Sequence, residues 1–337
     1  MIRIKDIAKI CGVSTATVSN VIHGKFKKVS PEVRERIELA IKENGYVPNQ
    51  SALSLVRTRS DMIGIVVADK MGSKYVMEDP YFSRLFTFLE REIRLRGKYM
   101  LLILGQSGDE ILTQAARWNL DGLILCNVHP KLMFEITGGY DKPVVTIDSL
   151  FEYDSESIVQ IRTNDYEGGY LMGEYFAGMN HKKVAMIADN DVAGDHFRWK
   201  GFQKGLADHG VHITDDAHII IKAGDKMEND EFERIYPMIQ DMTALFCASD
   251  YYALVCMQHL RNHGRKIPEE VSIAGFDDIL YATLFEPELT TIHQDMEEKA
   301  RIAVKSLMGM LEKKPVKHQI LTPVKLIERD SVLPKSE

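Results

Sequence analysis

The sequence predicts a small all-helical headpiece with a helix-turn-helix, followed by an α/β core of two doubly wound parallel-sheet subdomains. Three observations predict this fold class. Within residues 1–60, apolar residues recur at helical spacing between capping and turn residues. From residue 62 onward, short apolar runs alternate with helix-like stretches, which is typical of parallel sheets with helices on both faces. The length of 337 residues suits more than one core, because a domain averages about 150 residues.

Composition narrows the class of protein. The chain is 45% hydrophobic and 27% charged, which is typical of a globular protein. No apolar run reaches the ~20 residues that cross a bilayer, and Met1–Asp6 does not resemble the start of a secretory signal peptide. The four cysteines form no CxxC pair, and there is no HExxH motif. We therefore expect a cytoplasmic protein with no membrane segment, disulfide framework or structural zinc.

The net charge of −7 is unevenly distributed. Residues 1–60 contain 11 Lys and Arg against 5 Asp and Glu, whereas the rest of the chain contains 31 against 44. An acidic body with a basic N-terminal end repels polyanions everywhere except at that end. The pattern favours nucleic-acid binding by the N-terminal unit, although a merely solvated basic face has the same composition.

Residues 4–46 are predicted to form three short helices. Gly12 permits the left-handed turn that ends the first helix. Ser14 is a good N-cap for the second, and Ser30 followed by Pro31 begins the third. A three-helix protein-binding module is an alternative interpretation of the same pattern.

The first two helices have the spacing of a helix-turn-helix. Ala8 is small enough for a close helix crossing, Gly12 lies in the turn, and Val18 faces inward from the second helix. The second helix then presents small or short polar side chains that can approach base edges. These are Thr15, Ala16, Thr17, Ser19 and Asn20.

Five short motifs follow one another in this unit. They are Lys5-Asp6-Ile7-Ala8, Gly12-Val13-Ser14, Thr17-Val18-Ser19, Val29-Ser30 and Gly45-Tyr46-Val47-Pro48-Asn49. Together they resemble the headpiece of the lactose-repressor (LacI/GalR) family of transcription regulators. The resemblance implies that Thr15, Ala16 and Asn20 read bases. It also implies phosphate contacts for Lys5, Ser14, Thr17, Ser19 and Tyr46.

Residues 49–55 resemble the hinge helix of the same family. The segment is too short to be stable alone in water, so the resemblance implies that it orders when two copies meet on DNA. Ala52 and Leu55 are then expected to contact DNA, with Leu55 as an apolar wedge in the central minor-groove step. A buried linker residue is the alternative for Leu55.

The remainder of the chain alternates between predicted strands and helices. The strands are expected at 63–68, 99–104, 122–126, 144–147, 184–188, 219–221, 245–247 and 271–274. Helix-like stretches separate most of them, at 81–96, 109–118, 165–179, 196–209, 229–241 and 250–263. The number of strands suits two sheets in units of roughly 110–130 residues each.

Polar residues follow most of the predicted strands. Among them are Asn127, Asp148, Asp189, Ser249 and Asp277. Ligands of open parallel sheets bind beyond the carboxyl ends of the strands, so two sheets that face each other with such rims predict a polar cleft. Any one aspartate after a strand also suits the simpler role of capping the next helix.

Further motifs resemble the family's effector-binding core, which is similar to the periplasmic sugar-binding proteins. They include Asp79-Pro80-Tyr81-Phe82, Gly275-Phe276-Asp277-Asp278 and Leu289-Thr290-Thr291-Ile292-His293-Gln294. The resemblance implies that the ligand cleft is lined by Tyr81, Phe82, Asp148, Arg198, Ser249 and Asp277. Carboxylates, a guanidinium and an aromatic ring suit a polyol. Packing on a helix face is the alternative for Tyr81 and Phe82.

We therefore predict a headpiece at 1–47, a hinge helix and linker at 48–60, and an effector-binding and dimerisation core at 61–337. The chain is expected to cross between the two subdomains near residues 162, 293 and 322. No leucine-rich heptads follow Ser331, which favours dimers over coiled-coil tetramers.

The predicted function is that of a transcriptional regulator, in particular a repressor. A homodimer would bind pseudo-palindromic double-stranded operator DNA, and a sugar or sugar derivative would control its affinity. No cofactor, metal or catalytic residue is expected, because nucleophile, phosphate-loop and metal-ligand motifs are absent. The alternative is a solute-binding protein of a transport system, with the same cleft and no role on DNA.

Overall fold

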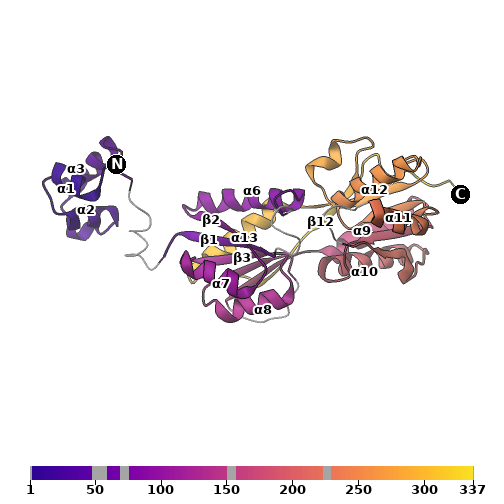
Figure 1. Cartoon of the computed structure of the whole chain (residues 1–337), viewed down its shortest axis with the longest axis horizontal. Coiled ribbons are helices and arrows are strands. Elements are labelled where there is room, and N and C mark those ends of the chain that lie inside the picture. Colours follow the sequence, from indigo (N-terminus) through magenta and orange to yellow (C-terminus); the bar gives the residue numbers. More distant parts are fainter. Residues whose placement is uncertain (1, 48–58, 69–75, 150–156, 223–228, 337) are drawn as a thin grey trace. The chain divides into compact units, whose positions relative to one another are not determined.

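The computed structural model describes residues 2–47, 59–68, 76–149, 157–222 and 229–336 (Figure 1). The chain divides into two units, Met1–Asp61 and Met62–Glu337. The first contains helices, and the second contains two six-stranded sheets flanked by helices, so the predicted fold class is confirmed. None of the helices in the described ranges combines the length and the hydropathy that crossing a membrane requires.

The first unit is a three-helix bundle. It contains α1 (Ile4–Ile10), α2 (Thr15–Ile22) and α3 (Pro31–Glu43), with a short 3₁₀ turn at Phe26–Lys28 between the last two. One side chain from each helix is fully buried in the shared core, namely Ile7, Val18 and Ile37. These helices have the predicted order.

Local chemistry fixes the ends of these helices. The backbone N–H of Arg3, the residue before α1, donates to the side chain of Asp6 at 2.8 Å. Asp6 is the third residue of α1, so its carboxylate caps the first turn of this helix. Gly12 adopts φ +61°, and the Oγ of Ser14 accepts the Thr17 N–H at 3.1 Å. The turn and the N-cap of a helix-turn-helix are therefore both present.

The first sheet of the second unit is entirely parallel, in the order β11-β5-β4-β3-β1-β2. Helices α6 (Pro80–Leu95) and α13 (Met296–Leu311) cover one face, and α7 (Gly108–Arg117) and α8 (Pro130–Gly139) cover the other (Figure 1). The strands are β1 (Met62–Ala68), β2 (Tyr99–Gly105), β3 (Gly122–Cys126), β4 (Val144–Ile147), β5 (Ile158–Thr163) and β11 (Gln319–Thr322).

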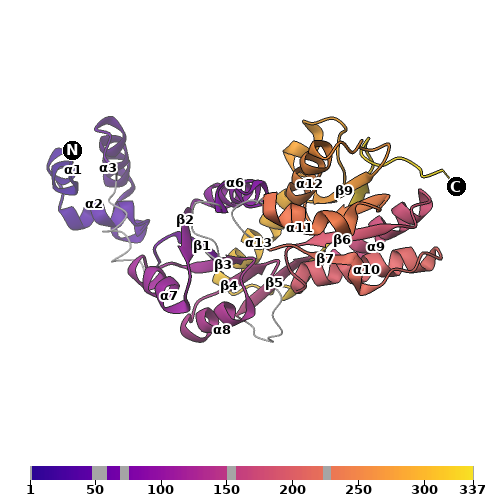
Figure 2. The same cartoon turned by 45° about the vertical axis from the view of Figure 1, so that its right-hand side comes forward.

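The second sheet has the order β12-β10-β9-β8-β6-β7. Helices α9 (Asp165–Gly178) and α10 (Ala193–Asp208) lie side by side on one face (Figures 1 and 2), while α11 (Asn229–Ile239) and α12 (Asp250–Asn262) cover the other. The strands are β6 (Val184–Ala188), β7 (His218–Ile220), β8 (Ala244–Cys247), β9 (Ser272–Asp277), β10 (Thr290–Gln294) and β12 (Val324–Ile327).

All eight strands predicted from apolar runs are present, with small shifts at their ends. Four further strands were not predicted: β5, β10, β11 and β12. The last of these is antiparallel to β10, unlike the expected all-parallel sheets. The reason is its route: the chain leaves the carboxyl end of β11 at Thr322 and enters the second sheet two residues later, so it has no room for a parallel crossover.

The chain passes between the two sheets three times within the described part of the second unit. The passages follow β5 at Asn164, β10 at Asp295 and β11 at Pro323. Each of the strands β5, β10 and β11 runs into a passage at its carboxyl end. The passages therefore lie at the same edge of each sheet as the carboxyl ends of the other parallel strands. This end of both sheets is therefore where a shared site is expected.

Glycines allow α9 and α10 to approach unusually closely. A Cβ added to Gly169 would lie 2.0 Å from the carbonyl oxygen of Arg198, and one added to Gly201 would lie 1.9 Å from that of Tyr166. No side chain fits in such a gap. The close contact matters for the site, because Arg198 is carried by α10 at this point.

Candidate functional site

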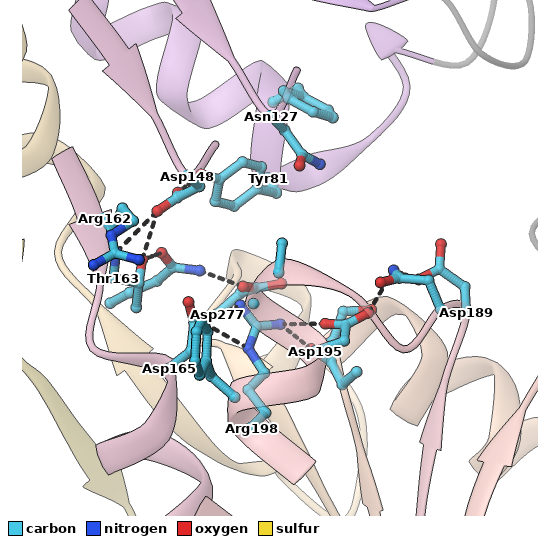
Figure 3. A pocket seen from close by; sticks show the side chains of 18 of the residues that line it. Tyr81, Asn127, Asp148, Arg162, Thr163, Asp165, Asp189, Asp195, Arg198 and Asp277 are labelled. Atoms are coloured by element: carbon cyan, nitrogen blue, oxygen red, sulfur yellow. Dashed lines mark hydrogen bonds and ion pairs between the residues drawn. The ribbon is translucent and has the colours of Figure 1, made fainter. Parts of the chain in front are cut away.

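A cavity of about 790 Å³ lies between the carboxyl ends of the two sheets (Figure 3). This volume is typical of a small-molecule site. Its walls include the residues that follow five strands: Asn127 after β3, Asp148 after β4, Asp189 after β6, Ser249 beyond β8, and Asp277 at the end of β9. The six residues predicted to bind the effector, Tyr81, Phe82, Asp148, Arg198, Ser249 and Asp277, all line this one cavity.

Arg198 is held firmly in the wall of the cavity (Figure 3). Its guanidinium contacts Asp165 at 2.8 Å and Asp195 at 3.3 Å, and donates to the carbonyl of Ala248 at 2.6 Å. It also stacks on the ring of Phe276 at 3.7 Å. Burial lowers the pKa of Arg198, but the charges of Asp165 and Asp195 outweigh this and hold it above its ordinary value. Most of its donors are therefore already occupied.

Asp148 lines the cavity and also accepts hydrogen bonds from several groups of the protein. Its Oδ2 accepts from Tyr81 Oη at 2.5 Å and from Lys299 Nζ at 2.6 Å, and its Oδ1 accepts from the N–H and hydroxyl of Thr163 at 3.0 Å. Burial raises the pKa of Asp148, while the charge and hydrogen bond of Lys299 bring it below its ordinary value. Asp148 is thus ionised, and the positive charge of Lys299 neutralises it.

A hydrogen-bonded chain links the two subdomains beneath the cavity. Lys299 donates to the side-chain oxygen of Gln294 at 2.5 Å, and the amide nitrogen of Gln294 donates to Asp277. Lys299 belongs to α13 on the first sheet, whereas Asp277 ends a strand of the second. Burial raises the pKa of Asp277 well above its ordinary value, and the charge of Asp250 adds to this.

Two predicted residues have structural roles as well. The Oγ of Ser249 caps α12 by accepting the N–H of Tyr252 at 3.3 Å. The ring of Phe82 lies 5.3 Å from that of Tyr81 and stacks on that of Phe86 at 5.8 Å. Phe82 therefore packs on its helix and lines the cavity at the same time.

Sequence reasoning missed several residues of this site. They are Thr163, Asp165, Asp195, Gln294 and Lys299. One signal was available for Lys299, because it lies at helical spacing among apolar residues of α13 and is fully buried with them. A charged residue on an apolar helix face calls for a buried partner.

The residues predicted to bind DNA lie on the first unit. Lys5, Ser14, Thr15 and Ala16 are exposed, and Thr17, Ser19, Asn20 and Tyr46 are partly exposed. Most of them belong to α2 or cap it, so this helix presents a continuous polar surface. Three exposed lysines that were not predicted follow α2 directly, at positions 25, 27 and 28. Ala52 and Leu55 lie outside the described residues.

Comparison with known proteins finds matches to both units. A model of the lacI family of bacterial regulatory proteins matches residues 3–49, and a model of the periplasmic-binding-protein-like domain matches residues 174–332. The HTH-type transcriptional repressor PurR of Histophilus somni is 30% identical over 331 residues, which cover 95% of this chain and 96% of the relative.

Solved structures share the fold. The lac repressor dimer bound to operator and the anti-inducer ONPF has a TM-score of 0.82 at 21% identity, over 98% of this chain and 99% of that one. A LacI family regulator from Enterococcus faecium with bound ribose has a TM-score of 0.69 at 24% identity, over 82% of this chain and all of that one.

Proposed function

Because the chain belongs to the LacI family of bacterial regulatory proteins, we propose that it is a DNA-binding repressor whose operator affinity is controlled by a small molecule in the cavity. One observation carries the proposal. The same chain combines a helix-turn-helix whose second helix is open to solvent with a polar cavity between two sheets. A solute-binding protein needs only the cavity, so the headpiece favours the regulator.

On DNA, α2 is the recognition helix. Its small outer side chains enter the major groove, with Asn20 as the residue suited to adenine and Ala16 to a thymine methyl. Two copies of the chain form a homodimer and bind the half-sites of a pseudo-palindromic operator. Lys25, Lys27 and Lys28 add sequence-independent contacts to phosphates. As a repressor acts on the chromosome, the protein works in the cytoplasm.

In the cavity, the effector is expected to be a carbohydrate or a derivative of one. Carboxylates, Arg198 and aromatic rings provide the acceptors, donors and apolar faces that a polyol needs. The Enterococcus faecium relative in fold carries ribose. The role of the cavity is regulatory rather than catalytic, and it uses no cofactor.

The ligand controls DNA binding through the two subdomains. It contacts both walls of the cavity, so it favours a closed arrangement over an open one by the difference between its affinities for the two. The arrangement that it favours changes the spacing of the headpieces in the dimer and, through that, operator affinity.

Replacing Asn20 with alanine tests the DNA-binding role. Genomic fragments retained by the wild-type and Asn20→Ala proteins are sequenced and compared at 0.1–0.2 M salt, since salt sets affinity. The variant should lose preference at one position of each half-site, a cost of about 1–3 kcal/mol for a bidentate base contact. Identical preferences at every position would remove Asn20 from base reading. If the wild-type protein retains no fragment selectively, the proposed function is wrong.

Replacing Asp277 with alanine should abolish the effector response and leave operator binding intact. Asp277 ends β9 and is 6% exposed, on the cavity wall. Because it adopts φ +119°, where asparagine is tolerated better than most residues, Asp277→Asn is the second variant. The exposed Asp241→Ala is the matched control. Operator release is measured against effector concentration, and a wild-type response in both Asp277 variants would show that the site is misassigned.

A further inference from the structure

The charges around the cavity do not balance. Six aspartates and two arginines line it among the described residues. Lys299 adds one positive charge from behind Asp148. With these three cations set against the six aspartates, the described lining has a formal excess of three negative charges around a space of about 790 Å³. Such an excess of negative charge favours a positively charged ligand, because a concave site with low-dielectric walls concentrates the electric field.

Three of the six aspartates have no ion pair among the described residues. Lys299 neutralises Asp148, and Arg198 is shared by Asp165 and Asp195. The other three, which we call the unpaired aspartates, are Asp79, Asp189 and Asp277. In the part of the chain that the structure describes, the hydrogen-bond partners of these carboxylates are uncharged groups or another carboxyl group. They are the backbone at Tyr81 and Phe82, the side-chain amides of Asn190 and Gln294, the hydroxyl of Tyr252, and Asp195 beside Asp189.

Asp277 has an acceptor to spare. Its Oδ1 accepts from Gln294, while its Oδ2 has no hydrogen-bond partner among the described residues. The residue is 6% exposed, and its carboxylate faces the cavity (Figure 3). Because this oxygen opens onto the cavity and is not buried within the protein, it is available to accept a hydrogen bond from a ligand.

The aspartates also disfavour one another's ionisation. The cleft desolvates the carboxylate of Asp79 although the residue is exposed overall, and this raises its pKa. Two backbone N–H donors lower that pKa, and the charge of Asp189 raises it again. Burial raises the pKa of Asp277, the charge of Arg198 lowers it, and the charges of Asp250 and Asp79 raise it again. A positive charge inside the cavity would relieve this repulsion.

Two aromatic rings adjoin the unpaired aspartates. Tyr251 and Tyr252 line the cavity with their ring centroids 5.8 Å apart, at 64° to each other. Burial raises the pKa of both hydroxyls, and the charge of Asp79 adds to this for Tyr251 and that of Asp189 for Tyr252. The hydroxyl ends of these two tyrosines therefore lie near the carboxylates. Aromatic faces beside carboxylates are typical of sites for ammonium groups.

We propose that the effector carries a protonated amino group together with its hydroxyls, as an amino sugar or amino polyol does, and that this group binds among Asp79, Asp189 and Asp277 beside Tyr251 and Tyr252. The hydroxyls lie toward Asp148 and Asn127, where the charge is already neutralised. This inference rests on the proposed function, because it takes the cavity to be the effector site.

Matched ligands test the proposal on the full chain. The probes are D-glucosamine, D-galactosamine and D-mannosamine, each with its parent hexose and its N-acetyl derivative, and glucose 6-phosphate as an anion. Isothermal titration should find an amino sugar that binds about 10- to 100-fold more tightly than its two uncharged partners, as expected for a hydrogen bond to a charged group. Its affinity should fall with salt. Its binding should release protons from Asp79 and Asp277, which appears as a dependence of the heat on the buffer.

A variant separates charge from shape. Asp189→Asn keeps the size of the side chain and should reduce amino-sugar affinity about tenfold or more, toward that of the parent hexose. The exposed Asp241→Asn is the control and should change nothing.

Three results would overturn the proposal: a hexose or glucose 6-phosphate that binds as tightly as every amino sugar, an Asp189→Asn variant with wild-type amino-sugar affinity, or no binding of any amino sugar. Retention of operator fragments by the same preparation is measured in parallel. If operator binding persists in these cases, the amine is rejected and the proposed function stands.

Discussion

Replacing Gly201 with alanine should destabilise the core by about 1–3 kcal/mol or more, the cost of overpacking a close contact. The added Cβ would lie 1.9 Å from the carbonyl oxygen of Tyr166, which is backbone of α9 and cannot turn aside. The two helices must separate, and Arg198 moves with α10. Urea unfolding of the full chain measures the loss. Tryptophan fluorescence is a suitable probe because Trp199 is buried in α10, next to the contact.

Gly178→Ala is the matched control for this prediction. Gly178 lies at the end of α9, and a Cβ added there meets no atom within 4 Å. Alanine is the better helix former, so the control should be neutral or stabilising by up to about 1 kcal/mol. Equal stability of the Gly201→Ala and Gly178→Ala proteins would show that the helices adapt and that the close approach is not required.

Replacing Lys299 with methionine should cost about 3–5 kcal/mol, the range for breaking a buried ion pair from one side. Lys299 is fully buried and donates to Asp148, Thr163 and Gln294, so its loss removes one hydrogen bond from each of these acceptors and leaves one carboxylate without its counter-charge. Lys305→Met is the control on the same helix, where the side chain is exposed and the change should stay within about 0.5 kcal/mol.

A double-mutant cycle of Lys299 and Asp148 isolates the contribution of their ion pair to stability. Asp148→Asn in the Lys299→Met background removes the uncompensated charge, so part of the lost stability should return. Urea unfolding of the four proteins gives the coupling energy. Additive effects would mean that Lys299 stabilises the core by packing and not through Asp148.

The sequence predicted the fold well where burial follows hydrophobicity. Each of the eight apolar runs that were predicted as strands is a strand. One of the four strands that were not predicted is β10, because Thr290, Thr291 and Gln294 are polar residues within a buried strand. Their hydrogen bonds come from other elements, such as the one from Thr291 Oγ1 to Asp250. A local pattern cannot reveal partners that the tertiary structure supplies.

The cleft was predictable for a topological reason. Residues that follow parallel strands gather at one edge of the sheet whatever their separation along the chain, which is why Asp148, Asp189 and Asp277 meet. The ion pairs were not predictable. Lys299 lies 151 residues from Asp148, and its helical position indicates burial without saying which carboxylate it meets. The charge left over in the cavity depends on those pairings, so only the structure exposes it.

The three passages between the sheets restrict how the core can move. A single connecting segment would permit swinging, sliding and twisting of one sheet against the other, but each additional segment that connects the two sheets removes some of these freedoms. With passages at Asn164, Asp295 and Pro323, the remaining soft motion is a bend across them. In the proposed function, occupancy of the cavity would therefore be converted into displacement along one mechanical coordinate, and a small molecule would give the same output in every copy of the protein.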